Sequence, residues 1–197
     1  MSTGRPREFE KTEALQKALM VFWKQGYRGA SLDDLTSAMG ISRPSLYAAF
    51  GDKSTLFLAT VELYLTEYIS EARNAISEEA DIRTAVERFL RISVKQFTNP
   101  KLPSGCLVAC HLSDVQLDQA VRHRIVMAGQ ATEALLTTRF ARALSDGQLP
   151  ASESPAELAA FFTCLLSGLS QSARTGSNRR QLDQIASRAI SVLEVQE

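Results

Sequence analysis

The sequence has no excess of charge of either sign. Its 22 basic residues are matched by 22 acidic ones, and the formal net charge is zero. This balance excludes a general nucleic-acid coat protein, which needs a large basic excess. Residues 1–55 carry 8 Lys and Arg against 6 Asp and Glu, net +2, which leaves 14 against 16, net −2, for the remainder. So small an excess fits a protein that combines a few phosphate contacts with contacts to bases.

The sequence also lacks a long hydrophobic run. Its longest apolar stretch, Leu158–Leu169, is interrupted by Thr163, Ser167 and Gly168, and no continuous apolar segment follows the basic residues near the start. A membrane-spanning helix needs about 20 mainly apolar residues, and a secretory leader has an apolar core after a basic start. We therefore expect a cytoplasmic protein that is neither secreted nor membrane-spanning.

Cysteine is scarce, with three residues at positions 106, 110 and 164. A small, odd number argues against a disulfide framework. The sequence also has no Cys-x-x-Cys pair, no glycine-rich phosphate loop and no serine nucleophile elbow. These absences favour a binding protein over an enzyme, and we expect neither a metal ion nor a cofactor.

Residues 31–41 carry the signals of a short helix and a turn. Ser31 can cap the helix, because its hydroxyl accepts from free backbone N–H groups. The apolar positions that follow repeat at helical spacing and predict one buried face: Leu32, Leu35, Ala38 and Met39. Gly40 stands where the chain must leave the helix with a positive φ, and Ile41 fills the corner.

A second short helix follows at once. Ser42 can cap it, and Pro44 falls in its first turn, where a missing N–H group costs nothing. The spacing turns Leu46 and Phe50 inward, and it turns three polar side chains outward: Arg43, Ser45 and Tyr47. An ordinary helical hairpin would not need all of these signals together. We therefore predict a helix-turn-helix whose second helix enters the major groove of DNA.

The pattern resembles the N-terminal domain of the TetR family of transcriptional regulators. That family has a Thr or Ser cap, a short helix, Gly-Val/Ile-Ser, a recognition helix with Tyr and Phe near its end, and a Lys that opens the fourth helix. The matching residues here are Ser31, Gly40-Ile41-Ser42, Tyr47, Phe50 and Lys53. The resemblance implies an all-α fold with a three-helix DNA-binding domain, residues 1–52, and a larger helical domain for effector binding and dimerisation, residues 53–197.

The expected DNA contacts combine the outward side of the second helix with its flanks. Gly4-Arg5-Pro6-Arg7 is interpreted as an extended basic arm whose arginines enter the minor groove, or alternatively as a solvated tail. Tyr47 and Lys53 are expected to contact phosphates. The predicted DNA-binding residues are Arg5, Arg7, Ser31, Ser42, Arg43, Pro44, Ser45, Tyr47 and Lys53.

Helical periodicity continues along the rest of the chain. The spacing predicts a first helix over Glu8–Gln25 that ends at Gly26, and one long helix over Lys53–Ile76 that joins the two domains. Further helices are expected over 82–97, 106–113, 115–144, 155–174 and 179–193, with loops at 99–105 and 146–150.

The last two of these helices suggest an interface. Ala160, Cys164 and Gly168 lie four apart and form a stripe of small residues. The last helix has an apolar face made of Leu182, Ile185, Ala186, Ala189, Ile190 and Leu193. Such helices can pack within their own domain, or they can pair with those of a second subunit. Because a dimer spans two half-sites of a palindromic operator, we expect a homodimer, and the TetR resemblance implies this same use of the last two helices.

One cluster outside the helix-turn-helix is chemically suggestive. Cys106, Cys110 and His111 lie within Pro103–His111, and Cys106 begins a helix, where free N–H groups lower the pKa of a thiol. The cysteines can equally be small apolar filler. The Pro-x-Gly-Cys stretch looks like that of a TetR subgroup, some of whose members respond to reactive electrophiles or small unsaturated compounds.

Aromatic and soft side chains of the second domain suggest the lining of an effector pocket, although each can also belong to the core. The candidates are Tyr64, Tyr68, Phe89, Phe97, Cys106, Cys110, His111, Met127 and Phe162. We predict a ligand-responsive transcriptional repressor that a small apolar or electrophilic effector releases from double-stranded DNA. The alternative is a thiol-based redox enzyme using Cys106 and His111, but the sequence offers no third group to orient the histidine.

Overall fold

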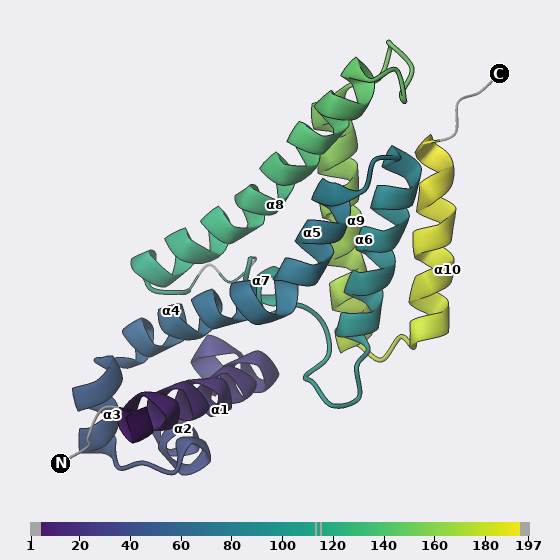
Figure 1. The fold of residues 1–197 in the computed structure, drawn as a ribbon. Helices are drawn as coiled ribbons and strands as arrows, with labels where there is room; N and C mark the ends of the chain where they lie inside the picture. Colours follow the sequence, from purple (N-terminus) through teal and green to yellow (C-terminus); the bar gives the residue numbers. More distant parts are fainter. Residues whose placement is uncertain (1–4, 113, 115, 194–197) are drawn as a thin grey trace.

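The computed structural model describes residues 5–112, 114 and 116–193, and every regular element among these residues is helical. Figure 1 shows two parts: α1, α2 and α3 pack together at one end, α5 to α10 form a larger lobe, and α4 runs between the two parts. The predicted all-α class and the order of a small N-terminal bundle before a larger helical lobe are confirmed.

The N-terminal bundle consists of α1 (Arg5–Gly29), α2 (Leu32–Met39) and α3 (Arg43–Phe50). The helical path of α1 breaks at Gly26, which has φ 78° and ψ 165°, so the predicted stop at this glycine is confirmed. The side chains at the centre of the bundle have no exposed surface: Leu19, Phe22, Leu35 and Leu46. Ala38 is exposed, contrary to prediction, because only Leu35 and Met39 of α2 lie on the side that faces α1.

The N-terminal arm is also corrected. Residues 5–7 form the first turn of α1 rather than an extended segment, which agrees with the tolerance of a helix start for proline. Gly4 lies outside the described residues, as do the side chains of Arg5 and Arg7.

The connection between the two parts is not the single rod that the spacing predicts. α4 (Lys53–Tyr64) leads into a π-helical turn, Leu65–Ile69, and then into α5 (Ser70–Glu78). A π turn accommodates an extra residue and changes the direction of the side chains that follow it. Figure 1 shows that α4 and α5 point in different directions. The turn therefore separates a helix that packs on α1 from a helix that belongs to the lobe.

The lobe contains α6 (Ile82–Phe97), α7 (Leu107–His111), α8 (Gln119–Ser145), α9 (Pro155–Arg174) and α10 (Arg179–Ile190), followed by a 3-10 turn, Ser191–Leu193. The two helices around the thiol cluster are shorter than expected, and Ser113 and Val115, at their predicted ends, lie outside the described residues. α6 buries every position on its apolar face: Ile82, Val86, Phe89, Leu90, Ser93 and Phe97.

Helix α10 uses most of its apolar face within the chain. Leu182, Ala186 and Ile190 are buried, and the helix packs on α6. Packing within the domain, one of the two uses expected for this helix, thus accounts for these buried residues. Only Ile185 and Val192 remain as large exposed apolar side chains in this segment, each 45% exposed.

The loop before α7 approaches α9 closely at Gly105. This residue has φ +79°, and a Cβ added to it would lie 2.8 Å from the backbone oxygen of Ser170. The position therefore needs glycine for two reasons, its left-handed backbone and the lack of space. Gly147 has a similar φ of +72° but no atom within 4 Å of an added Cβ.

We expect Gly105→Ala to destabilise the fold more than Gly147→Ala. The left-handed backbone costs an alanine about 1–2 kcal/mol at either site, and the contact with Ser170 adds roughly 1–3 kcal/mol of overpacking at Gly105 alone. Urea unfolding of both variants measures the difference. Equal losses of free energy of unfolding would contradict the close approach.

Candidate DNA interface and effector cavity

The helix-turn-helix is built by the predicted caps. The Ser31 hydroxyl accepts from the N–H of Asp34 at 3.0 Å, and the Asp34 carboxylate accepts from the N–H of Ser31 at 3.0 Å. Gly40 ends α2 in the left-handed region, with φ 70° and ψ 30°. The Ser42 hydroxyl then accepts from the N–H of Ser45 and opens α3. The two caps satisfy N–H groups that a helix start leaves unpaired, so they fix where α2 and α3 begin. The turn at Gly40 then sets the direction of α3 relative to α2.

Helix α3 presents one polar side to solvent. Leu46 and Phe50 are buried, whereas Arg43, Ser45 and Tyr47 are exposed, and so is Pro44. The Arg43 guanidinium is held by Asp33 of α2 at 2.7 Å, and this contact raises the pKa of Arg43. An exposed ion pair of this kind is weak. Arg43 can therefore exchange Asp33 for a base edge or a phosphate at little cost.

Lys53 lies at the edge of this polar side. It opens α4 behind the cap residue Asp52, whose carboxylate accepts from the N–H of Thr55 at 2.7 Å. The Lys53 ammonium lies over the Tyr27 ring, 4.8 Å from its centroid, and partial burial lowers the pKa of this lysine. A cation–π contact with Tyr27 therefore positions the lysine that we predict to bind a phosphate.

The broken end of α1 is attached to the lobe through its backbone. Because Gly26 interrupts the helix, the N–H of Tyr27 and the carbonyl of Trp23 lose each other as partners. The Tyr27 N–H donates to Nε2 of His111 at 3.0 Å, and the Arg174 guanidinium donates to the carbonyls of Trp23 and Lys24 at 3.0 and 3.1 Å. We call these contacts the α1 junction.

Two side chains of α1 extend the junction. The Trp23 indole N–H donates to the carbonyl of Gly105 at 3.1 Å, and the Tyr27 hydroxyl donates to the Asp118 carboxylate at 2.5 Å. Burial and Asp118 together raise the pKa of Tyr27 to about 12, so the phenol keeps its proton. Segments around residues 105, 111, 118 and 174 therefore all hold the end of α1.

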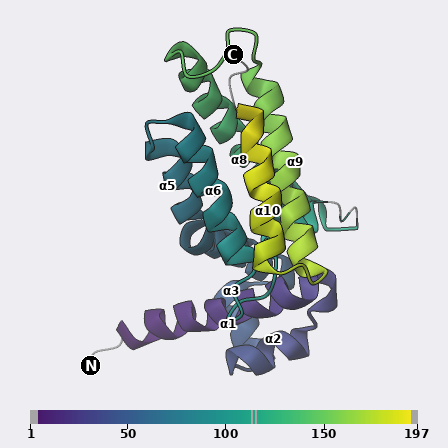
Figure 2. The same ribbon diagram turned by 90° about the vertical axis from the view of Figure 1, so that its right-hand side faces the viewer.

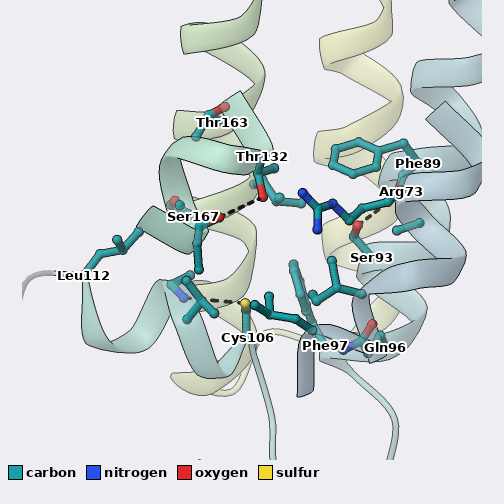
Figure 3. A pocket seen from close by; sticks show the side chains of 18 residues that line it. Arg73, Phe89, Ser93, Gln96, Phe97, Cys106, Leu112, Thr132, Thr163 and Ser167 are labelled. Carbon is teal, nitrogen blue, oxygen red and sulfur yellow. Dashed lines mark hydrogen bonds between the residues drawn. The ribbon is translucent and has the colours of Figure 1, made fainter. Parts of the chain in front are cut away.

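A cavity of about 60 Å³ lies inside the lobe (Figure 3). That volume holds a few water molecules. Its lining is mainly apolar and comes from the π turn and from α5 to α9. Three of the nine predicted effector residues line it: Phe89, Phe97 and Cys106.

The other six lie elsewhere because the core or the junction uses them. Tyr64 and Tyr68 stack on each other and pack edge-on against Trp23. Phe162 stacks on Phe140. Met127 is 46% exposed. Cys110 and His111 face the α1 junction, where Cys110 Sγ lies 3.5 Å from Arg174.

The cavity also has polar lining residues that sequence reasoning missed. They are Arg73, Ser93, Gln96, Thr132, Thr163 and Ser167. Only Ser93 carried a sequence signal, because it interrupts an otherwise apolar helix face between Phe89 and Phe97. The other five polar residues carry no such signal, because they line the same cavity only once α5 to α9 have packed around it.

The thiol of Cys106 differs from expectation. It caps α7 and accepts from the N–H of Ala109 at 3.5 Å, as a helix start predicts. Burial nevertheless raises its pKa, since desolvation outweighs the helix N–H groups. A thiol with a raised pKa is a poor nucleophile at neutral pH. Among the residues that the structure describes, no group of three or more His, Cys, Asp or Glu could hold a metal ion.

Comparison with known proteins agrees with this geometry. Residues 14–60 match the family model for bacterial regulatory proteins of the tetR family, and residues 70–189 match that for a tetracyclin repressor-like C-terminal domain. The chain belongs to the TetR family. That family consists of DNA-binding regulators rather than enzymes, so the thiol-enzyme alternative is not supported.

Relatives of this TetR-family chain match it over nearly its whole length. The transcriptional repressor ComR of Escherichia coli K12 is 31% identical over 191 residues, which cover 94% of this chain and 89% of ComR. The repressor BdcR of the same organism is 27% identical and covers 91% of this chain and 86% of its own length. A solved structure of a cysteine mutant of the TetR family regulator CifR with 26-base-pair operator DNA has a TM-score of 0.87 and 38% identity, covering 95% of this chain and 98% of that one.

No helix of the described residues combines the length and the apolar character needed to cross a membrane. The described part of this TetR-family chain therefore gives no indication of a membrane-spanning segment.

The α1 junction makes the fold sensitive to pH through His111. Its Nδ1 lies 2.7 Å from the carbonyl of Leu107, so Nδ1 carries the proton and Nε2 accepts from Tyr27. Burial lowers the pKa of His111 below its ordinary value of 6.5. Below that value the unfolded chain binds a proton that the folded chain does not, so the free energy of unfolding falls as the pH falls.

We expect the melting temperature to drop between about pH 7.5 and pH 5, and to drop less in His111→Gln, which is also less stable at pH 7.5. The exposed His123 is the only other histidine of the chain, and His123→Gln serves as the matched control with the wild-type profile. A His111→Gln profile as steep as that of the wild type would contradict the assigned role of the ring.

Proposed function

We propose that this TetR-family chain is a cytoplasmic transcriptional repressor that binds operator DNA as a dimer and is released when a small effector enters the cavity of its lobe. One observation carries the proposal. The helices that line the cavity also hold the broken end of α1, the central helix of the DNA-binding bundle. Repression is supported by the printed names of ComR and BdcR.

The DNA-binding face is assigned to the exposed side of α3. It combines a guanidinium that can form paired hydrogen bonds with a base, a phenol that is 50% exposed, and the adjacent Lys53. The similar structure of CifR on operator DNA supports this use of the bundle. We assign residues 1–52 to DNA binding and residues 53–197 to effector binding and dimerisation. The start of α4 nevertheless packs on α1 through Phe57 and Phe22.

The dimer surface is assigned to α9 and the outer side of α10. Figure 2 shows these helices side by side on one face of the lobe. Ala160, Cys164 and Gly168 are exposed there, and so are Phe161 and Ile185. Exposed large apolar side chains beside a stripe of small residues favour close helix pairing between two subunits.

The coupling between effector and DNA follows from short connections. Cys106, the cap of α7, lines the cavity with Val108 and Ala109 of that helix. His111, less than one turn after Ala109, accepts from the N–H of Tyr27. In α9, Thr163 and Ser167 line the cavity, Ser170 accepts from the N–H of Cys106 at 2.8 Å, and Arg174 holds the carbonyls of α1.

A ligand much larger than the 60 Å³ cavity must separate the helices that line it, and α7 and α9 then move with their contacts to α1. A coupling free energy of about 1–3 kcal/mol is enough to lower operator affinity 5- to 150-fold.

The effector we propose binds without a covalent bond. Cys106 lines the cavity, but its raised pKa argues against attack on an electrophile. Membership of the thiol-responsive TetR subgroup therefore stays a prediction, and the cavity supports a small, largely apolar effector.

Footprinting on the region upstream of the gene tests the function. We expect two protected half-sites about one duplex turn apart.

Two variants test the roles of single residues. Arg43→Ala should lose about 1–3 kcal/mol of operator-binding free energy and relax the preference at one base pair. Lys53→Ala should lower the affinity for all DNA sequences alike and reduce the slope of log affinity against log salt concentration by about 1. Fluorescence anisotropy at several salt concentrations separates the two. If Arg43→Ala still distinguishes the operator from other sequences as well as the wild type does, Arg43 contacts a phosphate and not a base.

The dimer surface is tested at Gly168, where an added Cβ meets no atom of the chain within 4 Å. Because Gly168 is also exposed, we expect Gly168→Leu to be tolerated within one subunit and to gain roughly 0.8 kcal/mol of helix propensity. At a close helix pair it would force the subunits apart, so we expect a monomer or a weaker dimer in analytical ultracentrifugation. Ala134→Leu, at an exposed position of α8, is the control and should stay dimeric. A Gly168→Leu protein with the wild-type dissociation constant would place the interface elsewhere.

A further inference from the structure

The cavity contains a cation without a partner. Arg73 of α5 is partly buried, and Figure 3 shows its guanidinium reaching into the cavity towards the side that carries Thr132 and Ser167. No hydrogen bond or ion pair joins this guanidinium to another residue of the described chain, and none of the described residues that line the cavity is Asp or Glu.

Three other arginines of the lobe have an ion-pair or hydrogen-bond partner. Arg88 pairs with Glu79 at 2.9 Å, Arg124 pairs with Glu62, and Arg139 donates to the carbonyl of Ala80 at 2.8 Å. Arg88 and Arg124 thus have anionic partners, and Arg139 has a carbonyl partner. Arg73 has neither among the described residues, and because it is partly exposed, its guanidinium is free to pair with an anion that enters the cavity.

A second polar group in the same lining is also unsatisfied. The Thr163 hydroxyl oxygen on α9 is buried and has no hydrogen-bond partner. Buried hydroxyl groups are normally paired, so such an atom needs an explanation. A ligand in the cavity that carries an acceptor atom would satisfy this hydroxyl.

We propose that the effector of this regulator is a small organic carboxylate with a short apolar chain. Its carboxylate pairs with the Arg73 guanidinium through two parallel hydrogen bonds and accepts a further bond from the Thr163 hydroxyl. Its chain lies against Phe89, Phe97 and Leu166, which form part of the apolar lining. This inference rests on the proposed function, because it names the chemical class of ligand for the same cavity.

The size of the cavity favours a carboxylate over other anions. A carboxylate group has three heavy atoms and a phosphate group has five, so the carboxylate needs the smaller expansion of a cavity of about 60 Å³. The planar fork of a guanidinium can form two parallel hydrogen bonds with either anion. A phosphate ester is the other source of the same anionic contact, and the experiment includes it.

The test measures direct binding to the full-length protein. Straight-chain carboxylates from propionate to octanoate are titrated by calorimetry, each beside the primary amide of the same chain length and an alkyl phosphate of similar size. We expect one short range of chain lengths to bind as the carboxylate, with the matching amide and phosphate at least about tenfold weaker, since a charged hydrogen bond is lost.

Arg73→Gln should lower the affinity for that carboxylate about ten- to a hundredfold and leave the weak affinity for the amide unchanged. Arg122→Gln removes an exposed arginine of α8 that does not line the cavity and should bind like the wild type. The comparison of carboxylate with amide uses only wild-type protein, so it decides the question even where Arg73→Gln does not fold.

Two failures are distinguishable. Equal affinities of wild-type protein for carboxylate and amide, or no binding of either, would overturn the carboxylate inference while operator binding stays intact. Tighter binding of the alkyl phosphate would overturn the carboxylate in favour of a phosphate ester. A protein that ignores its own upstream DNA at low salt but binds the carboxylate would refute the proposed function and leave the ligand class standing.

Discussion

The structure depends on how the broken end of α1 is satisfied. A break in a helix leaves backbone groups without helical partners, and Gly26 breaks α1 at a partly buried position beside the lobe. Arg174 of α9 supplies the missing donor for two carbonyls, and His111 of α7 supplies the acceptor for the freed Tyr27 N–H. The DNA-binding bundle is therefore held to the lobe through main-chain groups of α1. A movement of α1 relative to α7 or α9 must break or stretch these hydrogen bonds.

This arrangement gives the lobe control over the bundle. The two helices that hold α1 are also two of those that surround the cavity, and the cavity is too small to admit more than a short ligand without moving them. A packed lobe responds to such a ligand by shifting whole helices, because close-packed interiors resist gradual deformation. The π turn at Leu65–Ile69 lies at the wall of the cavity and at the end of α4, so it is a third connection between ligand and bundle.

The sequence predictions succeeded where the signal was local. Ser31, Gly40 and Ser42 act as predicted, because caps and turn glycines satisfy N–H and carbonyl groups within a few residues of themselves. They failed where neighbours decide the outcome. Helix-start geometry predicted a lowered pKa for Cys106, but burial raises it. The uninterrupted apolar spacing of residues 53–76 concealed a π turn.

The sequence by itself determined the helix-turn-helix, the outward side of α3 and the all-α class, since capping, glycine turns and helical periodicity act over distances of a few residues. Only the tertiary structure decided which side chains meet. It placed Phe89, Phe97 and Cys106 around the cavity with Arg73, and it moved His111 and Tyr64 into the contact with α1. Periodicity shows that a residue points inward, but the partner it meets there depends on how helices far apart in the chain pack together.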